Sequence, residues 1–459
     1  MATDTQYDQT QEGIPSLLDT DLYKLTMQCA VLANYPDVDV TYAFTNRTPD
    51  LKLTRAAFEW LEVQCAKLGD LRLTGDELEF LKKACPYLPA AYIAYLEKFY
   101  FRPAEQLKLT FTPAGETSVQ IGTEREEREL GADKLELGDV RIDVAGKWVE
   151  TILYEIPLLV LVSEAFFKFS NTDWNYDGQE ERAYNKAKVL LQNGCVFSEF
   201  GTRRRRSYHT QELVIKGIIR ANKEFSKGDG AGRLSGTSNV HFAHRFNLTP
   251  IGTVAHEWFM GIAAITDDYI SANEVGLGKW VNCFGEGTLG IALTDTFGTE
   301  QFLRCFAQPY KNGKSYAETF AGVRQDSGDP EMFVKRMREF YDSQGIKEEK
   351  TIVFSDSLDV ELCLKYNKAA RAAGFNVSFG VGTFLTNDFV HLSQPKKSTP
   401  LNIVIKISSA GGNPAVKISD NIGKNTGDKA TVERVKRDLG YTEKRWEDGD
   451  ERFRWGGKE

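Results

Sequence analysis

A recurring structural unit constrains the fold of this chain more than any other feature of the sequence. From about residue 145 onward, a short apolar strand, a polar loop rich in Gly, Ser and Thr, and an amphipathic helix follow one another repeatedly. This alternation is typical of βαβ crossovers, which build a parallel sheet covered by helices. We predict strands at 195–200, 249–253, 290–294, 321–324, 351–354 and 376–379. We predict helices over 209–225 and from residues 256, 300, 331 and 360 onward.

An open sheet and a closed barrel both satisfy this alternation. Several units within about 250 residues match the usual length of a βα barrel. Each polar motif also follows a strand and precedes a helix. A barrel gathers such loops on one face, whereas an open sheet concentrates them at one switch point. We therefore predict an α/β fold in which an irregular TIM-like α/β barrel spans 146–400 and follows an N-terminal α+β domain.

The segments on either side of this region have different patterns. A length of 459 residues favours two domains. We predict an α+β domain over 1–145, with a strand at 38–46, two or three helices and a hairpin at 107–121. The charged stretch 123–139 is typical of a solvated loop. Residues 401–459 hold a strand, a Gly-Gly turn, a second strand and a polar tail, which we expect to pack back on the N-terminal domain.

Composition narrows the class of protein. Hydrophobic residues make up 41% of the chain and charged residues 27%, a balance typical of globular proteins. No apolar run reaches the roughly 18 residues of a membrane span, and the polar N-terminus lacks the features of a signal peptide. The net charge of −8 disfavours nucleic acid or anionic lipid as the main partner. We expect no membrane or nucleic-acid partner, and a cytoplasmic location with the nucleus as a second candidate.

Cysteine and histidine usage argues against a metal centre. The seven cysteines are scattered, odd in number and never spaced as CxxC, and the chain has only five histidines. This pattern is typical of reduced thiols and predicts neither a disulfide framework nor a resident metal site.

Two loops carry groups that suit anions. Gly382 and Thr383 end a glycine-rich strand, where backbone N–H groups and a hydroxyl can hold a phosphate; an ordinary tight turn is the alternative. Four arginines, 203–206, follow the strand at 195–200, and guanidinium groups bind phosphate or carboxylate in a bidentate manner. We predict that Arg203 and Arg204 are ligands and that at least one of the other two is solvated. The alternatives are a solvated basic face and a nuclear-import run.

Charged and polar side chains also follow other predicted strands. Arg324 can pair with an anionic ligand, and Asp326 can orient a hydroxyl or a metal-bound water. Asp295 and Ser355 hold equivalent places in two further loops. Carboxylates that face arginines suit a substrate that combines phosphates, Mg²⁺ and sugar hydroxyls.

His256 is predicted at a junction between a strand and a helix. A single histidine is more often structural than functional. A neutral imidazole at a helix N-terminus, close to phosphate-binding loops, can act as a nucleophile or an acid–base group. By contrast, Asp329, which precedes Pro330, and the GTSN loop at 236–239 are predicted to cap helices.

Taken together, these motifs resemble the nicotinate phosphoribosyltransferase family in its fungal form. The similarity covers the chain from about residue 16 to 425, and the motifs are specific as a set rather than singly. They are SLLDTDLYKLTMQ (16–28), FGTRRRR (200–206), GTSN (236–239), TPIGTVAHEWF (249–259), LGIALTD (289–295), VRQDSGDP (323–330), VFSDSLD (353–359), FGVGT (379–383) and LNIVIK (401–406).

The resemblance implies a reaction and its participants. Nicotinate and 5-phosphoribosyl pyrophosphate would give nicotinate mononucleotide and pyrophosphate, a salvage step toward NAD. Hydrolysis of ATP to ADP and phosphate would be coupled to this transfer, as in a ligase. The resemblance further implies an irregular α/β barrel, Mg²⁺ that accompanies ATP and pyrophosphate, and commonly a homodimer with composite sites.

The resemblance also implies roles for individual residues. His256 matches the histidine that ATP phosphorylates. Tyr23 matches a tyrosine that stacks on the pyridine ring and is offered across the dimer interface. Arg324 and Thr253 match residues of the nicotinate site.

Further residues complete the expected pocket. Gly382 and Thr383 match the grip on the ribose 5-phosphate. The same pocket is expected to include Arg203, Asp295, Asp326 and Ser355, of which Asp295 and Asp326 are candidates for catalytic roles. The family tends to have an aromatic residue where this chain has Arg206, so no role follows for that position.

Two alternatives stay open. One is a related phosphoribosyltransferase that acts on nicotinamide or quinolinate. Nicotinamide-using relatives carry Asp in the loop where this chain has Ser238, which favours a carboxylate substrate. The other alternative is a nucleic-acid-binding protein that uses the arginine run; the net charge and the absence of interleaved aromatic residues argue against it.

Overall fold

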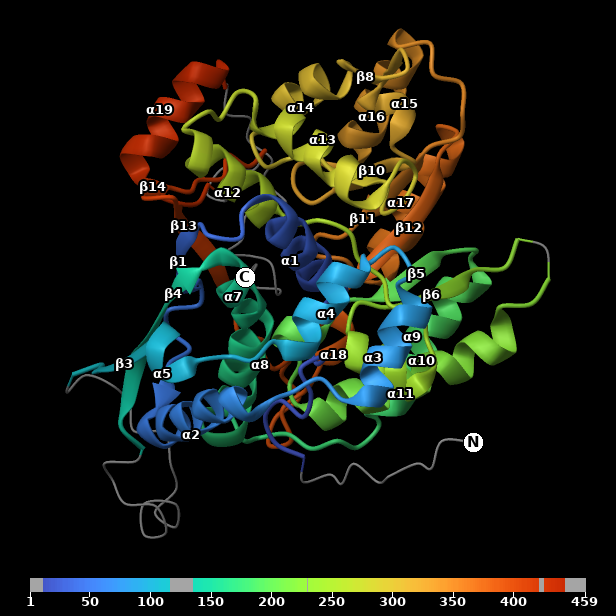
Figure 1. Cartoon of the computed structure of the whole chain (residues 1–459). Coiled ribbons are helices and arrows are strands. Elements are labelled where there is room, and N and C mark those ends of the chain that lie inside the picture. The colour runs from blue at the N-terminus through green and yellow to red at the C-terminus, as the bar shows by residue number, and fades with distance from the viewer. Residues whose placement is uncertain (1–10, 116–134, 229, 421–424, 442–459) are drawn as a thin grey trace.

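The computed structural model describes residues 11–115, 135–228, 230–420 and 425–441, which form two main sheets with helices around them (Figure 1). The first sheet is antiparallel and has the order β14-β13-β1-β4-β2, with β3 paired on β4. Its strands are β1 (Asp39–Asn46), β2 (Leu53–Thr54), β3 (Leu107–Pro113), β4 (Leu137–Lys147), β13 (Ile403–Ala410) and β14 (Asn413–Pro414).

Strand β13 pairs directly with β1, although the two strands are more than 350 residues apart in the sequence (Figure 1). The two strands run antiparallel from the Val40–Ala410 pair to the Asn46–Ile403 pair. Buried residues alternate with exposed ones at the start of β1, where Val40 and Tyr42 point inward, as a half-buried strand requires. The C-terminal strands therefore complete the N-terminal sheet, whereas the predicted domain boundaries stay a prediction.

The helices around this sheet carry strong local signals. Thr74 and Glu77 form a capping box at the start of α3. Helix α8 is apolar on all sides and almost wholly buried, as expected of a core helix. It packs against β13 and against the 202–204 turn, so it joins the two halves of the molecule. The helices are α1 (Leu22–Asn34), α2 (Arg55–Lys67), α3 (Gly75–Ala84), α4 (Ala90–Lys98), α5 (Pro103–Gln106), α7 (Trp148–Thr151) and α8 (Glu155–Ala165).

The second sheet is parallel and has the order β6-β5-β12-β11-β10-β7. Five of its six strands lie where strands were predicted, and the 351–354 strand has the predicted bounds, whereas β6 was not predicted. They are β5 (Val196–Glu199), β6 (Arg233–Thr237), β7 (Ile291–Leu293), β10 (Gly322–Gln325), β11 (Thr351–Phe354) and β12 (Asn376–Val381). A separate small hairpin joins β8 (Pro309–Lys311) and β9 (Lys314–Ser315).

Helices follow these strands, and side chains cap several of them. Asp329 accepts hydrogen bonds from two backbone N–H groups at the start of α16, and Asn239 caps α11, as predicted. The helices are α9 (Gln179–Gln192), α10 (Tyr208–Phe225), α11 (Val240–Phe246), α12 (His256–Thr266), α13 (Ala272–Phe284), α14 (Thr299–Phe306), α15 (Tyr316–Thr319), α16 (Pro330–Ser343), α17 (Val360–Ala372), α18 (Thr383–Thr386) and α19 (Lys429–Leu439).

The parallel strands follow their order in the chain in a cycle, since β12 returns to pair with β5. The predicted closed barrel is nevertheless not found. In the described part of the chain, the ladder ends at β6 on one side and at β7 on the other. The fold shown is therefore a mixed α/β fold with a parallel sheet whose ladder stays open.

The predicted strand at 249–253 is wrong, and its failure coincides with the open side of the ladder. The segment forms only an isolated parallel bridge between Pro250 and Thr237. Backbone hydrogen bonds join Thr237 to Thr249 and Ile251, but Pro250 has no N–H group with which to extend a ladder.

Two further predictions lie partly outside the described residues. The first arm of the hairpin at 107–121 is β3, which pairs with β4; its second arm and most of the 123–139 stretch are not described. None of the described helices is both long and apolar enough to span a bilayer.

Candidate active site

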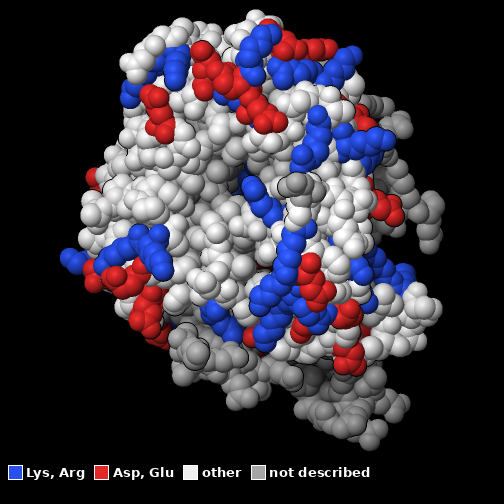
Figure 2. Space-filling model, turned by 90° about the vertical axis from the view of Figure 1, so that its right-hand side faces the viewer, with Lys and Arg blue, Asp and Glu red and all other residues white. Residues whose placement is uncertain are grey.

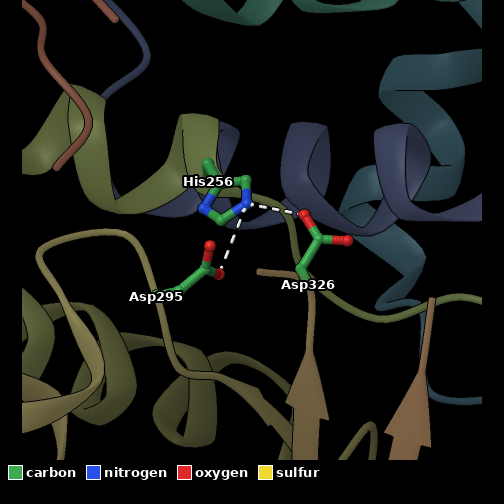
Figure 3. A group of neighbouring side chains, drawn as sticks. All are labelled: His256, Asp295 and Asp326. Carbon is green, nitrogen blue, oxygen red and sulfur yellow. Dashed lines mark hydrogen bonds and ion pairs between the residues drawn. The ribbon is translucent and has the colours of Figure 1, made fainter. Parts of the chain in front are cut away.

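The carboxyl ends of the parallel strands open into a cavity of about 460 Å³. In a parallel α/β sheet this is the edge at which loops from different strands meet. All the predicted site residues except Asp295 border the cavity: Tyr23, Arg203, Arg204, Thr253, His256, Arg324, Asp326, Ser355, Gly382 and Thr383. Asp295 is fully buried and lies directly beside His256 (Figure 3).

His256 is the first residue of α12, and its ring points into a charged cluster (Figure 3). Its Nδ1 atom lies 3.0 Å from the hydroxyl of Thr296. Its Nε2 atom lies 3.0 Å from Asp326 Oδ2 and 3.6 Å from Asp295 Oδ1. Two carboxylates therefore approach the ring nitrogen that faces the cluster.

Lys417 also approaches Nε2, and sequence reasoning missed this residue. Its ammonium nitrogen lies 2.9 Å from His256 Nε2 and 2.9 Å from Asp295 Oδ2. The side chain is buried, and Ser327 donates a hydrogen bond to the same Asp295 oxygen. A lysine inside the apolar run Val416–Ile418 is the only sequence signal of this role.

The surroundings of His256 favour a neutral ring. Burial, followed by the nearby Lys417 charge, lowers the pKa of His256 below its usual value despite the two carboxylates. Burial alone would raise the pKa of Asp326, but Arg324 and His256 hold it well below its usual range. The cluster thus combines ionised carboxylates with an imidazole that can act as a base or nucleophile.

A second group of residues that border the cavity consists of Arg324, Asp326 and Ser355. Arg324 donates to Ser355 Oγ over 2.7 Å and to Asp326 Oδ1 over 3.1 Å. The Ser355 hydroxyl lies 2.9 Å from the same Asp326 oxygen. These contacts fix the guanidinium at the ends of β10 and β11, where a planar donor can receive a carboxylate or phosphate.

The arginine run is arranged differently from the prediction. Arg203 is 43% exposed and lies 3.8 Å from Glu155. Arg204 borders the cavity, but it donates to Asn402 and to the Ile403 carbonyl, so its guanidinium is engaged by β13 and the residue before it. The expectation that Arg205 or Arg206 is solvated is wrong, because both are fully buried and bonded within the core.

Tyr23 and Thr253 lie at the side of the cavity formed by α1. Tyr23 borders the cavity of its own chain, and its role across a dimer interface stays a prediction. A Cβ atom on Gly252 would come within 2.9 Å of the Tyr23 backbone nitrogen, which explains the glycine next to Thr253. The Thr253 carbonyl accepts a hydrogen bond from Thr26 of α1. These contacts hold α1 against the loop that leads to His256.

Gly382 and Thr383 form the mouth of the cavity beyond β12. Gly382 precedes α18, and Thr383 is the first residue of this short helix. A Cβ atom on Gly382 would lie 3.1 Å from the Phe200 carbonyl, so a glycine allows β12 and β5 to approach closely here. Their role as a phosphate cradle stays a prediction.

His256, Asp295 and Asp326 could in principle hold a metal ion, because their ligand atoms all lie within 4.8 Å of one another. The Lys417 ammonium, however, already contacts both His256 Nε2 and Asp295. A lysine cation in this place supplies the positive charge that a resident metal ion would otherwise supply. A divalent ion bound by all three side chains therefore does not fit this arrangement.

Positive charge is concentrated locally on a chain whose net charge is −8. On the face shown in Figure 2, Lys and Arg side chains form a band beside a broad area of uncharged side chains. Such local concentration is what an acidic protein needs to attract anionic ligands.

Comparisons with known proteins agree on one family. A sequence model of the nicotinate phosphoribosyltransferase (NAPRTase) family matches residues 195–443, and its N-terminal domain matches residues 18–163. Nicotinate phosphoribosyltransferase from Saccharomyces cerevisiae is 48% identical over 96% of this chain and 99% of its own length. The enzyme of that name from Methanosarcina mazei is 39% identical over 91% of this chain and 96% of its own length.

Solved structures give the same result. The crystal structure of a putative nicotinate phosphoribosyltransferase from Saccharomyces cerevisiae superposes with a TM-score of 0.86 at 46% identity, covering 95% of this chain and 100% of that one. Nicotinate phosphoribosyltransferase from Porphyromonas gingivalis superposes with a TM-score of 0.78 at 32% identity, covering 93% of this chain and 100% of that one.

Proposed function

This chain belongs to the nicotinate phosphoribosyltransferase family, and from that premise we propose that it catalyses an ATP-coupled phosphoribosyl transfer. Nicotinate, 5-phosphoribosyl pyrophosphate, ATP and water give nicotinate mononucleotide, pyrophosphate, ADP and phosphate. The product belongs to the salvage route toward NAD. The observation that carries the proposal is the single cavity that His256, Arg324 and Thr383 share, although they are far apart in the sequence.

The transfer step requires positioning rather than a protein nucleophile on carbon. Displacement of pyrophosphate from C1 of the ribose builds oxocarbenium-like charge, as in glycoside cleavage. The residues must hold the pyridine nitrogen in line, bind the anionic ends and exclude water. Tyr23 stacks on the pyridine ring, Arg324 and Thr253 receive the nicotinate carboxylate, and Gly382 and Thr383 hold the ribose 5-phosphate.

The ATP step uses His256. Its neutral ring receives the γ-phosphoryl group, which adds negative charge and acceptor oxygens beside the substrates. Asp295 holds the Lys417 ammonium beside the ring, and Asp326 lies 3.0 Å from Nε2. Arg203 and Ser355 contribute to the same binding surface.

We propose that Mg²⁺ would accompany ATP and pyrophosphate as part of these ligands. It would neutralise the phosphate charge of these ligands. We further propose a homodimer in the cytoplasm, with the nucleus as a second location; light scattering should give about twice the 51.6 kDa of one chain.

A substrate competition assay tests the transferase proposal. The wild-type protein is expected to form a mononucleotide from nicotinate at least about tenfold faster than from nicotinamide, because the carboxylate pairs with Arg324 and the amide cannot. Quinolinate should also react more slowly than nicotinate, because its second carboxylate lies beside the ring nitrogen that must attack the ribose. A preference for nicotinamide or quinolinate instead would overturn the substrate assignment. Ser238, which occupies the discriminating loop, donates to Asp21 at the edge of the cavity.

A histidine substitution tests the ATP coupling. His256→Ala is expected to abolish ATP stimulation of nicotinate mononucleotide formation, since the phosphoryl acceptor is gone. His209→Ala is the matched control, because His209 lies on α10 and does not border the cavity. Unchanged ATP stimulation in His256→Ala would contradict the role of this residue.

The nucleic-acid alternative rests on the arginine run, and burial weakens it. Arg204 is 7% exposed, and Arg205 and Arg206 are fully buried. A basic run that points into the core offers little charge to a phosphate backbone.

A further inference from the structure

Lys417 contacts the atom that the proposed reaction uses, although it lies on a separate part of the chain. It belongs to the segment after β14, which runs beside the loop after β7 through a bridge between Phe297 and Ile418. The Ile418 N–H group donates to the Thr296 carbonyl over 2.8 Å. Backbone hydrogen bonds in both directions also tie Lys417 to Thr426. The lysine is thus anchored on both sides of its backbone.

The contact between Lys417 Nζ and His256 Nε2, at 2.9 Å, allows only one direction of hydrogen bonding. An ammonium group carries only donors, so Nε2 of His256 must accept the hydrogen bond through its lone pair. The ring proton then lies on Nδ1 and is donated to the Thr296 hydroxyl, 3.0 Å away. Asp326, also 3.0 Å from Nε2, would favour a proton on that nitrogen instead. Lys417 therefore favours an unprotonated Nε2, whereas Asp326 favours a protonated one.

We propose that Lys417 is a catalytic residue of the ATP-dependent half-reaction, in which it keeps Nε2 unprotonated for attack and then pairs with the transferred phosphoryl group. The proposal rests on the phosphorylation of His256 proposed above. In this step the bond between the γ-phosphorus of ATP and its bridging oxygen breaks, and a bond between that phosphorus and Nε2 forms. ADP leaves with the bridging oxygen, and later attack by water on phosphorus releases phosphate.

The position of Lys417 suits both parts of this role. Its second contact, to Asp295 Oδ2, holds the ammonium in place whether or not Nε2 is free. When phosphorus occupies Nε2, the lysine protons that faced the nitrogen can turn to the phosphoryl oxygens. Lys406, which borders the cavity, donates instead to Thr426 and has no contact with His256 within the described residues.

The test is the rate at which ATP labels His256 in Lys417→Met. Labelling from γ-phosphate-labelled ATP is followed as acid-labile protein phosphate, with His256→Ala as the background. Lys417→Met is expected to slow labelling about 100-fold, as when one donor to a developing anionic centre is lost. Lys429→Met, at an exposed site at the start of α19, is the matched control and is expected to label at the wild-type rate.

The pH dependence of labelling separates catalysis from mere packing. The charged groups that face His256 are Lys417, Asp295 and Asp326. Loss of the lysine charge removes one cause of the lowered pKa of His256, so the acidic limb of the pH–rate profile should move to higher pH in Lys417→Met. A purely structural role would slow labelling without moving this limb.

Each outcome decides between the alternatives. Slower labelling with the acidic limb moved to higher pH supports the proposal; wild-type labelling in Lys417→Met, or a slower rate with an unmoved limb, overturns it. If thermal melting shows that Lys417→Met does not fold, Lys417→Gln, which keeps a polar group without the charge, is expected to give the same loss and shift. Absence of labelling in the wild-type protein would overturn the proposed ATP coupling itself, which is thereby distinguished from a failure confined to Lys417.

Discussion

Arg205 and Arg206 are neighbours in the sequence, and both are fully buried, yet their partners differ in kind. Arg205 donates to both carboxylate oxygens of Asp19 and to Glu164, at 2.8 to 3.0 Å. Arg206 instead donates to the amide oxygen of Asn387 over 2.9 Å. Its guanidinium also lies over the rings of Phe167, Trp174 and Phe389. It donates a further hydrogen bond to the Ser398 hydroxyl over 2.8 Å.

This difference predicts unequal costs for the same substitution. Arg205→Met leaves two buried carboxylates without their cation and is expected to lower the free energy of unfolding by about 3–5 kcal/mol. Arg206→Met removes hydrogen bonds to neutral acceptors and places an apolar chain among aromatic rings, so the loss should stay near 1 kcal/mol. Chemical denaturation of both variants measures the contrast. Equal losses, or a larger loss for Arg206→Met, would show that the partners do not decide the cost.

At the scale of secondary-structure elements, a buried charge cluster joins the first turns of α1 and α12. Lys24 has no exposed surface and forms ion pairs with Glu257 and Glu155. Glu257 also accepts hydrogen bonds from Tyr42 and Trp148 at 2.5 and 2.8 Å. Because Lys24 follows Tyr23 and Glu257 follows His256, the cluster fixes the spacing of two residues that border the cavity.

A double-mutant cycle tests this joint between α1 and α12. Lys24→Met leaves the buried Glu257 carboxylate without its cation and is expected to cost about 3–5 kcal/mol of unfolding free energy. Glu257→Gln keeps the shape and most hydrogen bonds, and should cost about 1–2 kcal/mol. The double variant should lose about 1–3 kcal/mol less unfolding free energy than the sum of the two single losses, because the two side chains are in contact. Additive losses would exclude a direct interaction between them.

Five strands of the parallel sheet could be predicted from the sequence because their signals are local. The strand at 351–354 is a short apolar run, and Asp329 with Pro330 marks the start of α16. The burial of Arg205 could not be predicted, because its partner Asp19 lies 186 positions away. Lys417 was missed for the same reason, since its contact with His256 depends on a pairing of distant segments.

At the scale of the whole molecule, the cyclic order of the strands could be predicted but the open ladder could not. Alternation of strand and helix indicates a parallel sheet, whereas closure depends on hydrogen bonding in a single segment, where Pro250 permits only a bridge. The open ladder does not disperse the site, because the carboxyl ends of the strands still surround one cavity. Strand β13 of the first sheet supports that cavity, because Arg204 donates hydrogen bonds to Asn402 and Ile403 at the start of this strand.

The proposed function requires that one cavity receives both ends of the substrate beside His256. A crystal structure of the chain with nicotinate mononucleotide bound tests this claim directly. We predict the pyridine ring against Tyr23, its carboxylate at Arg324, and the 5-phosphate at Gly382 and Thr383. A product molecule bound outside this cavity, or with its phosphate away from the loop after β12, would contradict the claim.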